Sequence, residues 1–271
     1  LVNSLKTHKD KDITSINYKE LFKKEGFLIK RDLFSKNKLR TYINEFDRIV
    51  SQLIKSKESI NAKWGTILTK EIESSKSKVF HTHNVQSYSA KMLSMILNKK
   101  LLDIIELLIG PDIILHHSKL FFKPPLIGAA FPLHQDWSYF PTKRDTMIAA
   151  VIHLSKSDEE MGCFRIIPKS HHLGKINNSD GHTYNRKIHQ KYKLDDALPI
   201  IAKAGDVLFF DARTIHGSLP NNSIEARKTI LLQLYSGMDE IVPNNKHTNV
   251  QLVLRGINHN ATRSSVSNIK A

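Results

Sequence analysis

The spacing of hydrophobic and polar positions changes near the middle of the chain. In the first half, apolar residues recur every three or four positions, which is typical of amphipathic helices. Three segments combine this spacing with a capping or terminating residue: 18–24 before Gly26, 36–53 after Ser35, and 89–108 before Gly110 and Pro111. Residues 27–29 are predicted to form a short strand.

Beyond residue 111, short apolar runs are separated by Pro, Gly, Asn and Asp, which is typical of strands joined by turns. The predicted strands are 113–115, 120–122, 146–154, 164–167, 198–202, 207–210 and 229–234. Helices followed by many short strands favour an α+β protein that is mainly β. We expect its core to be a β-barrel or a jelly roll.

The order of elements predicts a single domain, because β-rich domains commonly reach roughly 250 residues. We expect residues 1–16 to be a loose arm and 17–110 to be a helical support. Residues 111–240 would form the jelly-roll core, followed by a C-terminal extension over 241–271. The segment 55–78 is polar, rich in Lys and Ser, and only weakly periodic, so it is a candidate lid.

Composition restricts the class of partner only loosely. The 41 Lys and Arg against 26 Asp and Glu give a net charge of +15, which indicates either an anionic partner or a solvated Lys-rich surface. The single cysteine, Cys163, excludes an internal disulfide framework and favours a reducing, cytoplasmic setting. No apolar run approaches the roughly 18 residues of a membrane-spanning helix. The chain begins with Leu1 rather than Met, so the removal of a native leader stays an open alternative.

The strongest chemical signal is a histidine and an aspartate two residues apart. If this segment is extended, alternation directs His134 and Asp136 to the same side. A third ligand, His216, follows a Gly-Asp turn and a buried strand. Two histidines and one carboxylate are the ligand set of non-haem Fe(II) oxygenases, which leaves positions open for a cosubstrate and O2.

A candidate anion-binding residue begins the next predicted strand. Arg227 follows His216 and an intervening turn, so an antiparallel return would bring its guanidinium back toward the metal. There it could bind a carboxylate through two hydrogen bonds. His81 and His83 also have i, i+2 spacing, but they stand in a polar segment without a nearby carboxylate and are a weak metal candidate.

Together these motifs resemble the phytanoyl-CoA dioxygenase family of Fe(II)/2-oxoglutarate-dependent oxygenases. The resemblance depends on the order and spacing of short pieces: Gly26–Ile29, Leu108–Asp112, Phe122–Pro125, His134–Pro141, Gly162–His171, Ala204–Val207, His216–Ser218, Arg227 and Asn249–Gly256. It implies a double-stranded β-helix, which is a cupin-like jelly roll, with flanking N-terminal helices. It also implies that His134, Asp136 and His216 hold Fe(II), and that Arg227 and Ser218 bind the distal carboxylate of 2-oxoglutarate.

Further candidates for ligand contact lie on and around the predicted strand 117–123. Alternation puts His117, Lys119 and Lys123 on one face. A buried lysine without a partner is costly, so an inward Lys119 or Lys123 indicates an anionic cosubstrate or substrate. We place Lys119 and, from the resemblance, Lys78 near 2-oxoglutarate, and Lys123, His117 and Trp137 near the substrate. The simpler alternatives are lysines that reach solvent and a tryptophan that only packs in the core.

The resemblance implies oxidation of a small or medium organic metabolite with release of succinate and CO2. Hydroxylation, desaturation and rearrangement all stay open, whereas halogenating relatives have Gly or Ala in place of Asp136. Nucleic-acid demethylases have a second Arg where this chain has Gln233, so nucleic acid is not the expected partner despite the charge. Two alternatives stay open: a catalytically silent cupin-like binding or sensing protein, and a basic nucleic-acid-binding protein. The sequence predicts neither the substrate nor the oligomeric state.

Overall fold

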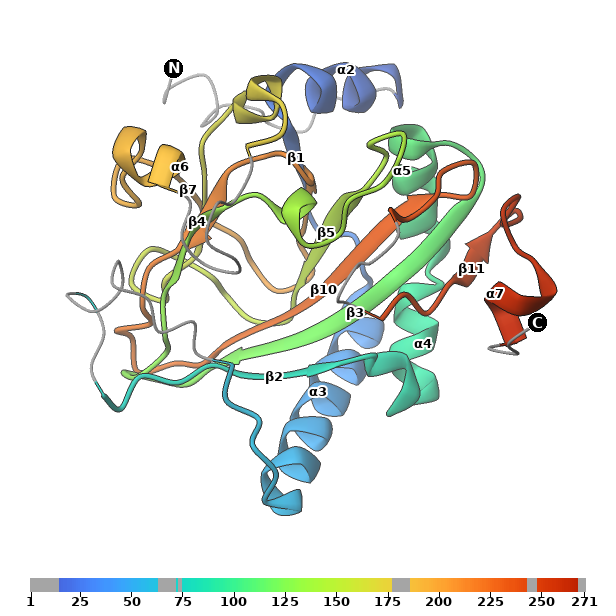
Figure 1. Ribbon diagram of the computed structural model, residues 1–271. Helices are drawn as coiled ribbons and strands as arrows, with labels where there is room; N and C mark the ends of the chain where they lie inside the picture. Colours follow the sequence, from blue (N-terminus) through green and yellow to red (C-terminus); the bar gives the residue numbers. More distant parts are fainter. Residues whose placement is uncertain (1–14, 63–71, 73–74, 177–185, 243–247, 268–271) are drawn as a thin grey trace.

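The computed structural model describes residues 15–62, 72, 75–176, 186–242 and 248–267, whose strands form two antiparallel sheets (Figure 1). The larger sheet has the order β1-β8-β5-β10-β3-β11, and β2 also pairs with β3. Its strands are β1 (Phe27–Lys30), β2 (Phe80–His83), β3 (Ile113–Lys123), β5 (Ile148–His153), β8 (Val207–Asp211), β10 (Arg227–Ser236) and β11 (Leu252–Arg255). The smaller sheet has the order β4-β9-β6-β7, formed by β4 (Phe131–His134), β9 (His216–Ser218), β6 (Phe164–Ile166) and β7 (Leu198–Ile200).

The helices of the first half cover one face of the larger sheet, where β3 and β10 run side by side (Figure 1). They are α2 (Ser15–Glu25), α3 (Lys36–Ser56), α4 (Ala90–Ile96) and α5 (Lys99–Ile109). Two shorter helices, α6 (Arg186–Lys191) and α7 (Arg263–Ser267), lie later in the chain. Buried side chains of α3, α4 and α5 form one core cluster with Leu120, Ile230 and Leu232 of the sheet.

Alternation along β10 separates this helical core from the interior between the sheets. Ile230 and Leu232 pack against the helices, whereas Leu231 packs against Phe164 of the smaller sheet. The opposite face of β10 therefore points between the two sheets, where a jelly roll has its interior. The prediction of a mainly β, jelly-roll protein with flanking helices is confirmed.

The prediction of one helix over residues 89–108 is wrong, because the chain breaks at Leu97 and Asn98. The Asn98 side chain accepts hydrogen bonds from the backbone N–H groups of Lys100 and Leu101 and so starts α5. The predicted strands 113–115 and 120–122 are parts of one long strand, β3. Of the predicted extension 241–271, β11 joins the edge of the larger sheet beside β3.

Two histidine pairs lie differently from their predicted positions. His81 and His83 do not stand in a loop, because residues 80–83 form β2. Strict alternation along a strand would put His116 and His117 on opposite faces of β3, but a register shift in the β10–β3 ladder leaves His116 as an extra residue. Both rings therefore contact Phe140, at centroid distances of 5.4 and 4.7 Å.

Two of the predicted segments fall mainly outside the described residues. The arm is described only from the start of α2, and the candidate lid 55–78 is described only at its ends and at residue 72. Among the described helices, none is both long enough and apolar enough to cross a membrane.

Candidate metal centre

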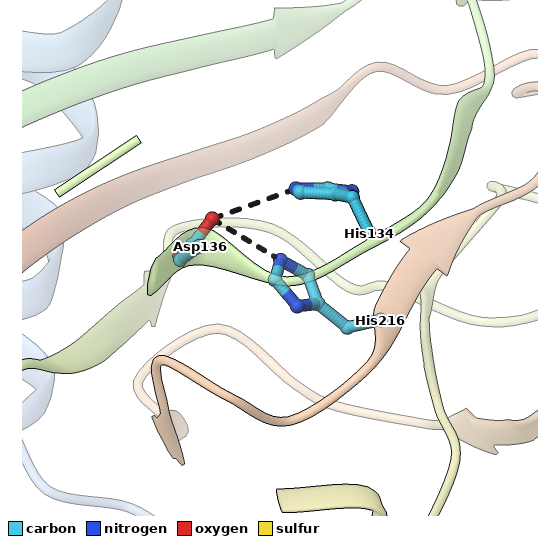
Figure 2. A group of neighbouring side chains, drawn as sticks. All are labelled: His134, Asp136 and His216. Atoms are coloured by element: carbon cyan, nitrogen blue, oxygen red, sulfur yellow. Dashed lines mark ion pairs between the residues drawn. The ribbon is translucent and has the colours of Figure 1, made fainter. Parts of the chain in front are cut away.

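The structure brings His134, Asp136 and His216 together, as the spacing predicts (Figure 2). All three are buried, and their ligand atoms lie within 4.8 Å of one another. His134 ends β4 and His216 begins β9, and the two residues are direct partners in the ladder. Asp136 does not continue the strand as predicted, because it opens the 3-10 turn η2 (Asp136–Ser138). That turn still directs its carboxylate toward both rings.

Backbone carbonyls fix the orientation of both imidazoles. His134 Nδ1 lies 2.8 Å from the carbonyl oxygen of Pro132, and His216 Nδ1 lies 3.0 Å from that of Thr214. Each carbonyl requires a proton on Nδ1, so the lone pair of each ring is on Nε2. Those Nε2 atoms face Asp136 Oδ1 at 3.5 and 3.7 Å. The donor set therefore fits a divalent cation such as Fe(II).

The charges at this centre also favour a cation. Burial opposes ionisation of Asp136, but His216, His134 and Lys119 outweigh it and hold the pKa of this carboxyl below its usual range. Burial, helped by the charge of His134, lowers the pKa of His216 to about 4. His216 is therefore neutral near pH 7, which is the form that binds a metal.

Gln233 was not predicted as part of this site. It lies on the inward face of β10, and its Nε2 donates to Asp136 Oδ2 at 2.5 Å. Alternation from Arg227 places Gln233 on the same face, and this is the one sequence signal that could have identified it. Its hydrogen bond leaves Asp136 Oδ1 as the oxygen that faces the two histidines.

Two buried cationic side chains lie side by side where β10 begins. Arg227 and Lys123 are direct partners across β10 and β3, with exposed fractions of 2% and 0%. Lys123 Nζ donates to Ser218 Oγ at 2.8 Å and to the carbonyl oxygen of Leu219 at 2.7 Å. Lys123 thus lies beside Ser218 and Arg227, the residues expected to bind 2-oxoglutarate.

Arg227 is poorly satisfied within the described part of the chain. Its Nη1 donates to the carbonyl oxygen of Gly162, and its guanidinium lies 5.2 Å from the ring centroid of Phe164. Its Nε has no hydrogen-bond partner within the described structure. No described carboxylate forms an ion pair with it, and burial lowers its pKa to about 10. A buried guanidinium in this state favours binding of an anion from outside the chain.

The other predicted contact residues are dispersed around the centre. Lys119 is half-buried and its Nζ lies 5.1 Å from the ring centroid of Phe140. His117 is buried beside the same ring. Trp137 packs in the cluster around Phe140, and its indole N–H donates to Gln135. Lys78 has an exposed side chain, and its backbone forms an isolated parallel β-bridge with Gly128.

Comparison with known proteins agrees with this geometry. The family model described as phytanoyl-CoA dioxygenase (PhyH) matches residues 22–229. The chain belongs to the phytanoyl-CoA dioxygenase family. Among its relatives, the peroxisomal phytanoyl-CoA dioxygenase of Bos taurus is 26% identical over 233 residues, which are 82% of this chain and 68% of that protein. A probable alpha-ketoglutarate-dependent hypophosphite dioxygenase of Stutzerimonas stutzeri is 31% identical over 157 residues, covering 55% of this chain and 54% of that protein.

Solved structures share the fold at lower identity. The epimerase SnoN, in complex with Fe3+, alpha ketoglutarate and nogalamycin RO, has a TM-score of 0.72 at 16% identity and covers 90% of this chain and all of its own. The apoform of EctD from S. alaskensis has a TM-score of 0.68 at 18% identity, covering 91% of this chain and 87% of its own. The predicted family and enzyme class are confirmed: this family member is a non-haem Fe(II)/2-oxoglutarate-dependent dioxygenase that uses O2 and oxidises a small molecule.

Proposed function

We propose that His134, Asp136 and His216 are the three protein ligands of Fe(II). The support is geometric: two Nε2 atoms and one carboxylate oxygen converge, and each imidazole is held by a carbonyl at its other nitrogen. When bound, iron supplies the activation of O2 that lets 2-oxoglutarate be decarboxylated and a substrate C–H bond be oxidised. The side chains of Phe210 and Phe164 lie beside His216, at centroid distances of 4.3 and 6.4 Å, and help to exclude water.

The cosubstrate would extend from the metal toward the buried cations on β10 and β3. Its distal carboxylate would accept hydrogen bonds from Arg227 and Ser218, as the family resemblance implies. Lys123, which we expected near the substrate, would contribute a second positive charge there, because it already donates to Ser218. The observation that carries the proposal is Arg227, a buried guanidinium without a described carboxylate partner, which lies against the same ring, Phe164, as His216.

The remaining roles follow from position. Lys119, which we expected near 2-oxoglutarate, lies close enough to the metal centre to affect Asp136, and its Nζ and the ring of His117 both lie against Phe140. Lys78 is the weakest of the proposed cosubstrate contacts, because its side chain is exposed. Trp137 would contact substrate only through the face of its ring, since its indole N–H is already bonded to Gln135. The substrate is a small metabolite that is hydroxylated, desaturated or rearranged, with release of succinate and CO2.

The setting of the enzyme is part of the proposal. The single cysteine favours a reducing, cytoplasmic location, and Cys163 is buried. We propose that the chain is one dioxygenase domain. We propose no nucleic-acid partner, because position 233 holds not a second arginine but a glutamine, which donates a hydrogen bond to Asp136.

Succinate formation by the purified protein tests this function. Anaerobic protein would be loaded with Fe(II) and 2-oxoglutarate and then exposed to O2, with and without a panel of small metabolites. We expect slow succinate release without substrate, faster release with a substrate, and none for Asp136→Ala. Product formation without consumption of 2-oxoglutarate would contradict the proposal. A protein that binds 2-oxoglutarate but never forms succinate would instead support a silent binding protein.

A further inference from the structure

Beside the metal centre, β2 and β3 present a group of basic side chains on one face. His83 is the direct partner of Lys119 across the two strands. The rings of His81 and His83 lie 5.3 Å apart, and those of His83 and His117 lie 5.5 Å apart. His81 also stacks on Phe121, which packs toward the smaller sheet. We call His81, His83, His117 and Lys119 the basic cluster.

Lys119 supplies the amine of this cluster. Among the described residues, no carboxylate forms an ion pair with its ammonium and no acceptor forms a hydrogen bond with it. Its Nζ lies 5.1 Å from the ring centroid of Phe140. Burial lowers the pKa of Lys119, and the negative charge of Asp136 only partly opposes this effect. A half-buried ammonium with an aromatic ring but no acceptor favours an anion supplied from outside.

His81 adds a second group in the same place, which donates when its proton is on Nδ1. Its Nδ1 is buried and has no hydrogen-bond partner within the described structure. Burial and the charge of Lys119 lower the pKa of His81, against the opposing effect of the Ile60 carbonyl. Asp136 cannot serve both groups, because its Oδ2 accepts from Gln233 and its Oδ1 faces the two metal-site histidines.

The basic cluster is separate from the cations at Arg227. Lys119 and Lys123 are on the same face of β3 but four residues apart, which is roughly 13 Å along a strand. A single carboxylate therefore cannot contact both lysines. If the distal carboxylate of 2-oxoglutarate occupies the end at Arg227 and Lys123 and its other carboxylate binds the metal, the basic cluster is left for a different anion.

Building on the proposed function, we propose that the basic cluster binds an oxyanion of the substrate, so that the substrate is a small organic acid, either a carboxylate or a phosphonate or phosphate. These groups share the property that matters, which is a set of anionic oxygens that accept hydrogen bonds from ammonium and imidazole N–H. The position of Lys119 near Asp136 places this oxyanion next to the metal centre. The oxidised C–H bond would then lie close to the charged group of the substrate.

Calorimetric titration of the anaerobic protein loaded with Fe(II) and 2-oxoglutarate tests this assignment. The probes are propionate, methylphosphonate and the neutral propionamide. We expect at least one anion to bind and propionamide not to bind detectably. Lys119→Met should weaken anion binding at least tenfold and His81→Phe about threefold, whereas Lys119→Arg should restore most of it. Lys100→Met, which removes an exposed lysine on α5, is the matched control for charge and should change nothing.

The result with 2-oxoglutarate separates this inference from the proposed function. Because this inference moves Lys119 from the cosubstrate, where we first expected it, to the substrate, the dissociation constant of 2-oxoglutarate in Lys119→Met should stay within threefold of the wild-type value. Loss of 2-oxoglutarate affinity without loss of anion binding would overturn the inference, as would equal binding of propionamide. Failure of both anions to bind a wild-type protein that binds 2-oxoglutarate would also overturn it. If the wild type binds no 2-oxoglutarate, the proposed function fails, but anion binding that depends on Lys119 would still support the basic cluster as an oxyanion site.

Discussion

Gln233 Nε2 donates a hydrogen bond of 2.5 Å to Oδ2 of Asp136, which joins the larger sheet to the candidate metal centre. The other oxygen of Asp136 faces the Nε2 atoms of His134 and His216. The two carboxylate oxygens are therefore in different environments. A metal bound here would meet a carboxylate that is held in place for coordination through Oδ1 alone.

Loss of this hydrogen bond should weaken metal binding without unfolding the protein. Gln233→Leu keeps the size of the side chain but leaves Oδ2 of a buried carboxylate without its donor. Loss of such an outer partner typically reduces metal affinity roughly tenfold to a hundredfold. The measurement is the Fe(II) dissociation constant under anaerobic conditions, with the unfolding temperature of the metal-free protein measured beside it.

Thr229→Val is the matched control for Gln233→Leu. Thr229 is buried on the same strand, but no hydrogen bond links it to Asp136, and its hydroxyl has no partner within the described structure. We expect its Fe(II) affinity to equal that of the wild type. Equal affinity in Gln233→Leu as well would remove Gln233 from the support of the metal centre.

Substitution of a proposed ligand should remove the stabilisation that the metal provides. A ligand that binds only the folded state at about 100 times its dissociation constant stabilises it by roughly 2.7 kcal/mol. We therefore expect Fe(II) to raise the unfolding temperature of the wild type but not of His134→Ala, Asp136→Ala or His216→Ala. His172→Ala, which changes an exposed histidine outside the site, should respond like the wild type. A normal response in a ligand variant would show that this residue does not hold the metal.

Local patterns predicted the centre because its geometry depends on short segments. His134 and Asp136 are near each other in the chain, and the Gly-Asp turn before a buried strand indicated where His216 would follow. Arg227 was expected to return along a strand antiparallel to the segment of His216, but β9 and β10 belong to different sheets and β10 pairs with β3 and β5 instead. The stated reason for His134 and Asp136 was also wrong in part, since the strand ends at His134.

Contacts between distant segments could not be read from the sequence. Alternation puts Gln233 on the face of Arg227, but only the packing of one sheet on the other brings it to Asp136. The pairing of His81 with β3 is another case, because polar neighbours gave residues 80–83 the pattern of a loop. The break at Asn98 had a local signal in its capping side chain, but the apolar spacing on both sides concealed it.

Replacement of Arg227 should have opposite effects on cosubstrate binding and on stability. A hydrogen bond to a charged group contributes about 1.5–3 kcal/mol. Arg227→Met should therefore lower 2-oxoglutarate affinity roughly tenfold to a hundredfold, at about 1.4 kcal/mol per factor of ten. Removal of a buried charge that lacks a described carboxylate should raise the urea midpoint of the ligand-free protein. Unchanged 2-oxoglutarate affinity would indicate that Lys123 is the principal anchor.

The stability of the metal-free protein should fall as the pH drops below about 6.5, in part because of His153. This residue is fully buried on β5, and burial, together with the charge of Arg227, lowers its pKa to about 4. The unfolded chain binds a proton near pH 6.5, whereas the folded protein resists protonation until about pH 4. The contribution to stability is therefore complete above pH 6.5 and is lost progressively toward pH 4. Between pH 7 and pH 5 the loss from this one group is about 2 kcal/mol.

His153→Phe tests this dependence, because it keeps an aromatic ring next to Phe164 and removes the titrating group. Free energies of unfolding from urea titrations at pH 7, 6 and 5 should decline less steeply in this variant than in the wild type. The difference should reach about 2 kcal/mol at pH 5. His172→Gln, at an exposed position, should keep the steeper wild-type slope. Parallel curves for His153→Phe and the wild type would show that His153 titrates equally in the folded and unfolded states, which contradicts a folded pKa near 4.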